Sequence, residues 1–155
     1  MSERPDMVRQ ARESIRNLIR DPVTKLLLTN SQLTTTQLET LLANSFSTEA
    51  NVRRTLRHLY RPSGRNFSRG AFNRTLIQAQ NNVIRSIYTV LLLGYVGLHD
   101  TASLQPFLEL SDTIQSYVHE MHQATTDDES VLRELSTRLA EGISSLARRQ
   151  SFKDQ

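Results

Sequence analysis

The stretch NFSRGAFNRTLIQAQNNVIRSIYTVLLL, residues 66–93, changes character along its length and decides how the whole chain is interpreted. Its first half is polar and basic, and its second half is an almost continuous apolar run. Ser68 is a good N-cap residue, because its hydroxyl can accept a hydrogen bond from a free amide of the first helical turn. Phe72 and Leu76 recur at helical spacing, so we predict one long helix whose second half, Val83 to Leu93, is a buried stem.

Helical periodicity also dominates on both sides of this stretch. The further helices are predicted from Met7 to about Asp21, from Thr34 or Thr36 through Phe46, from a cap at Ser47 or Thr48 to about Tyr60, from Leu104 to Met121, and from about Asp127 to Leu146. The short apolar segment from Val23 to Asn30 fits a helical turn or an edge strand and is left as a connector. No alternating strand pattern, internal repeat or low-complexity linker is present. The expected fold is therefore all-α, a compact bundle of about six helices with a long central buried helix.

The second of these helices begins with threonines that can cap it. Thr34 with Gln37, or Thr36 with Glu39, can form a capping box that satisfies free amides at a helix start. The inward-facing residues are expected to be apolar, namely Leu38, Leu41, Leu42 and Phe46.

The chain length fits a single domain, which we place at residues 1–150 with a frayed tail at 151–155. Within it we distinguish acidic C-terminal helices at 103–149. Cysteine is absent, which excludes thiol catalysis, cysteine-ligated zinc and disulfides and fits a reducing compartment. The N-terminus shows no secretory signal, and the nearly apolar run Ile87 to Leu98 is shorter than the ~20 residues needed to cross a bilayer. A cytoplasmic protein without a membrane partner is expected.

The net charge of +3 is distributed unevenly. Residues 1–49 are neutral, and residues 100–155 carry five basic and ten acidic side chains. Residues 50–99 hold eight arginines and neither an acid nor a lysine. This separation is larger than ordinary surface mixing and points to a phosphate-bearing or acidic partner for the middle third. The arginines are Arg53, Arg54, Arg57, Arg61, Arg65, Arg69, Arg74 and Arg85.

Residues 47–85 resemble a helix-turn-helix unit, in which one helix braces a second that enters the major groove. The resemblance is carried by residues 66–80, where a serine cap, a basic residue, small residues and an Asn-Arg-x-Leu run occur as in the recognition helices of DNA-binding regulators. One departure is the gap from Tyr60 to Ser68, which contains Pro62 and Gly64 and exceeds the usual three or four residues.

The physical case for DNA is independent of that resemblance. Arginines that neutralise phosphates release condensed counterions, and arginine pairs bidentately with guanine while Asn and Gln pair with adenine. Taking about 100° per residue, Arg69 and Asn73 lie on one helix face and Phe72 and Leu76 on another. The predicted DNA-binding residues are Arg53, Arg54, Arg57, Arg61, Arg65, Ser68, Arg69, Asn73, Arg74 and Gln78.

Two other interpretations remain open. The arginines can instead pair with the acidic C-terminal third, which includes Glu109, Asp112, Asp127, Asp128, Glu129 and Glu134. The basic face can also bind an acidic protein or RNA, as part of a helical interaction module that is not an enzyme.

No enzymatic site is expected. His119 and His122 lie three residues apart but lack a third metal ligand at a recognisable spacing, and no phosphate loop or serine elbow is present. We predict no catalytic residue, no metal and no cofactor. The seam of Leu132, Leu135, Leu139 and Leu146 is typical of core packing, and it can also support a homodimer through the C-terminal helices. The expected function is DNA-binding transcriptional regulation.

Overall fold

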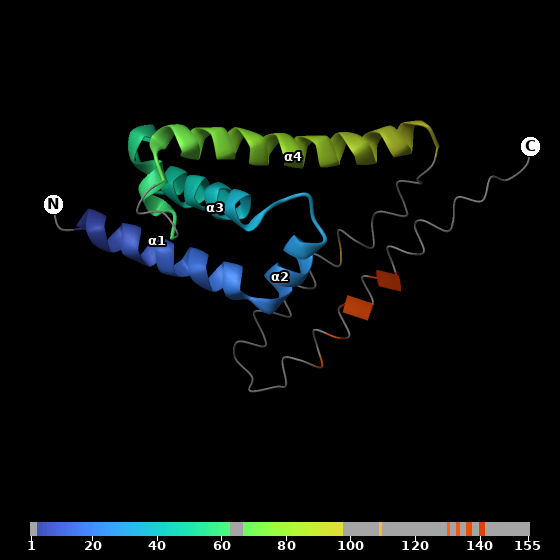
Figure 1. The fold of residues 1–155 in the computed structure, drawn as a ribbon, viewed down its shortest axis with the longest axis horizontal. Coiled ribbons are helices and arrows are strands. Elements are labelled where there is room, and N and C mark those ends of the chain that lie inside the picture. Colours follow the sequence, from blue (N-terminus) through green and yellow to red (C-terminus); the bar gives the residue numbers. More distant parts are fainter. Residues whose placement is uncertain are drawn as a thin grey trace, which may run out of the picture. The chain divides into compact units, whose positions relative to one another are not determined.

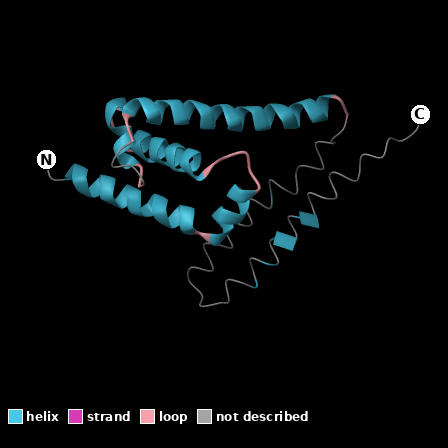
Figure 2. Ribbon diagram, in the orientation of Figure 1, coloured by secondary structure: helices cyan, strands magenta, loops and turns pink. Residues whose placement is uncertain are grey.

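A computed structural model describes residues 3–62 and 67–97, together with isolated helical positions at Glu109, Ser130, Arg133, Ser136, Thr137, Ala140 and Glu141. All the elements described are helices or loops (Figure 2), so the predicted all-α class is confirmed. The chain divides into two compact units, Met1–Ile87 and Tyr88–Gln155. The single domain predicted over residues 1–150 stays a prediction.

The described elements follow one another in the order α1, α2, α3, η1 and α4 (Figure 1). Their bounds are Glu3–Arg20 for α1, Pro22–Thr29 for α2, Thr35–Glu49 for α3, Arg54–Tyr60 for the 3-10 helix η1, and Arg69–Tyr95 for α4. Apart from those isolated helical positions, the predicted helices at Leu104 to Met121 and Asp127 to Leu146 lie outside the described residues, and the count of six stays a prediction.

Residues Val23 to Thr29 of the predicted connector belong to α2, and Asn30 is the C-cap of that helix. Asp21 caps this helix, because its carboxylate accepts a hydrogen bond from the Thr24 amide at 2.7 Å. Pro22 occupies the first turn, where a missing N–H costs nothing and the proline ring presets the helical φ. The cap and the proline together explain why α1 ends at Arg20 and a new helix begins directly after it.

The N-terminus of α3 is the predicted capping box with Thr34 and Gln37. The Gln37 amide donates to Thr34 Oγ1 at 3.2 Å, and the Thr34 amide donates to Gln37 Oε1 at 3.1 Å. The predicted inward face is confirmed in part, because Leu42 and Phe46 pack against the core, although they are half-buried like Leu38 and Leu41. The fully buried positions of α3 carry other side chains, namely Thr40, Ala43 and Ser47 together with Glu39.

Burial of hydroxyl groups on α3 is possible because the helix itself satisfies them. Thr40 Oγ1 donates to the Thr36 carbonyl at 2.7 Å, and Ser47 Oγ donates to the Asn44 carbonyl at 2.9 Å.

The predicted helix from Ser47 or Thr48 to Tyr60 is wrong. Asn51 has a φ of 51°, in the left-handed region, and this conformation ends α3. The Asn51 amide donates to the Thr48 carbonyl at 3.0 Å and the Val52 amide to the Ser47 carbonyl at 2.8 Å, the two bonds of a Schellman motif. The chain therefore turns after Glu49 and resumes as η1.

The core of the first unit draws side chains from four elements. It consists of Ala11 and Ile15 from α1, Ala43 from α3, Tyr60 from η1 and Phe72 from α4. Figure 1 shows the ribbons of α1, α3 and the first turns of α4 side by side. Phe72 is 2% exposed, so it anchors α4 to this core.

The predicted buried stem of α4 is wrong. Its only buried residues are Phe72 and Ala79, whereas Ile87 is 55% exposed and Leu91 is 61% exposed. Apolar side chains occur here on several faces of the helix, and the elements described cover only the face that carries Phe72 and Ala79. No helix among the described residues is both long and apolar enough to cross a membrane.

Candidate nucleic-acid interface

Arg61 lies in the protein interior rather than at its surface. Its side chain is 4% exposed, and its Nη2 atom lies 2.9 Å from Glu39 Oε2 of α3, whose side chain is 11% exposed. The guanidinium also stacks on the Phe67 ring, 3.8 Å from the ring centroid. These contacts leave no surface for a phosphate, so we reassign Arg61 from the predicted interface to the core.

Arg57 braces η1 against α3. Its Nη1 atom donates to Asn44 Oδ1 at 2.9 Å, and its side chain is half-buried. Arg57 Nε is buried without a hydrogen-bond partner in the described part of the protein. Two of the arginines predicted to contact DNA therefore hold the connection between α3 and α4 in place.

The remaining arginines of this connection are only partly described. Arg53 is exposed and stands at the start of η1. The side chain of Arg54 and all of Arg65 lie outside the described residues. The structure does not bring these three together in one described surface.

The predicted residues on α4 are all exposed. Ser68 caps the helix, since its Oγ accepts a hydrogen bond from the Ala71 amide at 3.1 Å, as predicted. Arg69, Asn73, Arg74 and Gln78 follow it, none of them buried. At about 100° per residue, Arg69 and Asn73 lie about 40° apart around the helix, and so do Arg74 and Gln78.

The pair formed by Arg74 and Gln78 is extended by two more residues later in α4. Asn81 and Arg85 are exposed, and at about 100° per residue they fall with Arg74 and Gln78 inside a sector of about 60°. We call Arg74, Gln78, Asn81 and Arg85 the arginine–amide row. At about 1.5 Å of rise per residue it extends about 16 Å along the helix. The predicted DNA-binding residues end at Gln78, although Asn81 and Arg85 follow Arg74 by seven and eleven residues, which is helical spacing.

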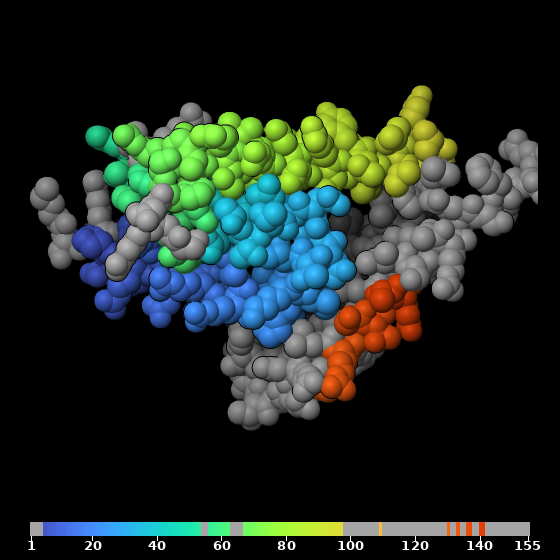
Figure 3. Space-filling view, in the orientation of Figure 1, coloured from blue at the N-terminus to red at the C-terminus, as the bar shows by residue number. Residues whose placement is uncertain are grey.

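The row lies away from the packed side of α4. Its four members carry amide or guanidinium groups, and residues 50–99 contain no aspartate or glutamate. Figure 3 shows α4 as a continuous green to yellow band of side chains on the face in view. Asn82, on the packed side, donates from Nδ2 to the Gln32 carbonyl at 3.1 Å and to Gln37 Oε1 at 3.2 Å.

The connection between the two candidate helices differs from a tight helix-turn-helix turn. α3 ends at Glu49 and α4 begins at Arg69, so the whole of η1 lies between them. A turn of three or four residues is therefore not formed by α3 and α4.

Several other predicted features lie outside the described residues. These are His119 and His122, the leucine seam at 132, 135, 139 and 146, and the acidic residues of the C-terminal third other than Glu109 and Glu141, which are exposed. Among the described residues, no group of three or more His, Cys, Asp or Glu side chains is arranged to hold a metal ion.

Comparison of the chain with protein-family models, curated proteins and solved structures finds no match.

Proposed function

We propose that this protein binds double-stranded DNA through the exposed face of α4 and acts as a transcriptional regulator. The observation that carries the proposal is the arginine–amide row, an exposed line of cationic and amide side chains in a region without a single acid. An α-helix fits the major groove of B-form DNA, and these are the side chains that bind phosphates and base edges there.

The proposed contacts divide into two kinds. Arginine at a phosphate supplies affinity that falls as salt rises, because each neutralised phosphate releases condensed counterions. Arginine at a guanine edge and asparagine or glutamine at an adenine edge supply sequence preference. Arg74 and Arg85, separated along the helix by Gln78 and Asn81, offer both kinds of donor.

The packing of α4 supports this use of its outer face. Phe72 lies in the core, and Asn82 is bonded to the start of α3. Both contacts fix the rotation of the helix about its own axis. The row is then presented at a constant angle, which reduces the entropy lost on binding.

The test is a fluorescence-anisotropy titration of duplex DNA at several salt concentrations. We expect binding at low salt and a steep negative slope of log affinity against log salt. Arg74→Ala should reduce the magnitude of that slope by about 1 if Arg74 contacts a phosphate, or reduce affinity unequally among sequences if it contacts a base. Arg16→Ala is the matched control, because Arg16 is also exposed but lies on α1.

Two results would contradict the proposal. One is a protein that does not bind duplex DNA at low salt. The other is an Arg74→Ala variant that binds no more weakly than Arg16→Ala, since the affinity would then come from charge in general rather than from α4.

A second candidate function is a helical interaction module whose basic face binds an acidic protein or RNA. It is favoured by Ile77 and Ile84, which are 57% and 48% exposed on the side of α4 between Arg69 and the arginine–amide row. Apolar side chains gain more from a protein surface than from phosphates. Competition experiments separate the possibilities: an acidic peptide or single-stranded RNA that displaces duplex DNA at equal concentration would favour this second function.

A further inference from the structure

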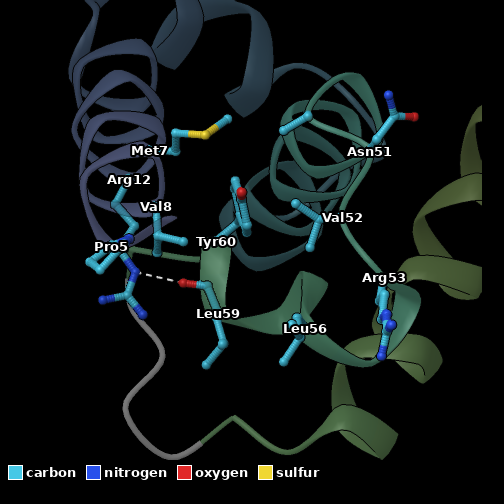
Figure 4. Close-up of a pocket in the computed structure, with 11 residues that line it drawn as sticks. Pro5, Met7, Val8, Arg12, Asn51, Val52, Arg53, Leu56, Leu59 and Tyr60 are labelled. Carbon is cyan, nitrogen blue, oxygen red and sulfur yellow. Dashed lines mark hydrogen bonds between the residues drawn. The ribbon is translucent and has the colours of Figure 1, made fainter. Parts of the chain in front are cut away.

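A pocket in the first unit has the size and chemistry of a small-molecule site. Its volume is about 580 Å³, and it opens between α1, the turn after α3 and η1 (Figure 4). Cavities of roughly 300–1,000 Å³ with mostly apolar walls and a few polar groups are typical of ligand sites. This site uses none of the residues on α4 and stands independently of DNA binding.

The walls of the pocket are apolar and open to solvent. Met7, Leu56 and Leu59 line it and are 42%, 39% and 40% exposed. Val8 and Val52 complete the apolar lining and also pack against the core. Figure 4 shows Met7 extending from α1 toward Tyr60 and Val52 on the opposite wall. An apolar ligand seated here would remove these side chains from water.

Positive charge flanks the apolar walls. Arg12 of α1 donates from Nε to the Leu59 carbonyl at 2.7 Å, which fixes its guanidinium beside η1 and leaves both terminal nitrogens for another acceptor. Arg53 stands on the other side of the pocket (Figure 4). No carboxylate is among the described residues that line the pocket, so its charge complements an anion.

Tyr60 supplies a polar group inside the pocket. The residue is 4% exposed and its ring belongs to the core. Its hydroxyl makes no hydrogen bond with the described residues, and Figure 4 shows it directed into the space between Met7 and Val52. A buried phenol usually finds a partner, so this hydroxyl is a free donor and acceptor for a bound molecule.

The wall opposite α1 is built on the turn that ends α3. Asn51 holds the left-handed conformation there, and the Schellman bonds of Asn51 and Val52 fix the backbone. The backbone positions from which the side chains of Val52 and Arg53 extend are therefore fixed before any ligand arrives.

We infer that this pocket binds a small amphipathic carboxylate. Its apolar body would lie among Met7, Val52 and Leu56, and its carboxylate would accept hydrogen bonds from Arg12 and from the Tyr60 hydroxyl. Charge-assisted hydrogen bonds of this kind are about twice as strong as neutral ones, so the carboxylate and the apolar body contribute together.

Isothermal titration calorimetry with octanoate tests the inference, with 1-octanol as the neutral probe of the same chain length. We expect saturable binding of one octanoate per chain, about tenfold or more tighter than that of 1-octanol. Arg12→Gln should remove most of this difference. The control Arg16→Gln removes an exposed arginine of α1 that does not line the pocket, and it should bind octanoate like the unchanged protein.

A second variant, Leu56→Trp, keeps the test decisive if Arg12→Gln unfolds. It places a larger apolar side chain at a partly exposed position, so it should fill the pocket and abolish octanoate binding without loss of helical circular dichroism.

A third variant, Tyr60→Phe, tests the hydroxyl. It should weaken octanoate binding several-fold and leave 1-octanol binding unchanged.

Three results would overturn the inference. Octanoate and 1-octanol binding equally well would show an apolar site with no role for the arginine. Failure of octanoate to bind at millimolar concentration would exclude the proposed ligand class. Sedimentation equilibrium showing a dimer that Leu56→Trp dissociates, with no effect of octanoate, would identify a second copy of the chain as the occupant.

Discussion

Replacing Arg61 by alanine should destabilise the protein severely. The substitution removes the 2.9 Å ion pair with Glu39 and leaves a carboxylate in α3 that is only 11% exposed without its arginine. Removing one partner of a buried pair costs about 3–5 kcal/mol, and the lost stacking on Phe67 adds about 0.5–2 kcal/mol. The expected loss of about 4 kcal/mol or more is comparable with the whole stability of a marginal domain, about 5–15 kcal/mol.

Urea denaturation followed by circular dichroism measures this loss. With a denaturant slope of about 2 kcal/mol per M, a loss of about 4 kcal/mol lowers the midpoint by about 2 M. Arg53→Ala is the matched control, because Arg53 is exposed and a surface substitution usually changes stability by no more than about 0.5 kcal/mol. A loss below about 1 kcal/mol for Arg61→Ala would refute the reasoning.

A double substitution separates the structural role of Arg61 from a role in binding. Replacing both charges by methionine, in Glu39→Met with Arg61→Met, should recover most of the stability, because buried ion pairs often contribute no more than apolar residues of similar volume. The recovered protein should bind duplex DNA with unchanged affinity and salt slope. A weakened complex in this stable variant would return Arg61 to the interface.

Three further substitutions, each with a control substitution, test the fold. Asn51→Val should cost about 1–2 kcal/mol in a thermal melt, because the left-handed φ crowds a β-branched side chain, whereas Asn51→Gly should be neutral; equal melting of the two would argue against the Schellman turn. Phe72→Ala should cost about 3–5 kcal/mol, since it empties a site that is 2% exposed, and Arg74→Ala on the same helix should cost almost nothing. Asp21→Ala should cost about 1 kcal/mol and Asp21→Asn much less, unless the cap of α2 contributes nothing.

The features predicted correctly are those that depend on neighbouring residues. The capping box of Thr34 and Gln37 and the cap at Ser68 each involve partners three residues apart, so the sequence alone contains the whole interaction. The end of α3 could not be predicted in the same way. Asn51 is compatible with a helix interior and with a left-handed cap, and the choice depends on Val52 and Phe46 packing against the core.

The roles of the arginines depended on tertiary contacts. Arg57 and Arg61 lie in the same acid-free region as Arg69 and Arg74, and nothing local distinguishes them. The ion pair of Arg61 is with Glu39, which is 22 positions away in the sequence. Charge patterning therefore identified the basic region correctly but could not divide it into buried and exposed members.

The prediction that the second half of α4 is buried was wrong for a related reason. An apolar run indicates that a helix face needs a neighbour but does not indicate which neighbour or how much of the face it covers. Val83 and Ile87 are exposed because none of the described elements covers them, while Phe72 and Ala79 on the same helix are buried.

The side-chain oxygen of Gln37 connects two helix segments through a single atom. It accepts one hydrogen bond from the Thr34 amide at the start of α3 and another from Asn82 in α4. Fraying of the first turn of α3 therefore breaks a contact to α4 as well, so the two segments should open as one cooperative unit. In native-state hydrogen exchange, the amide of Gln37 and those of the α4 turn around Asn82 should share one opening free energy, and Asn82→Ala should separate them.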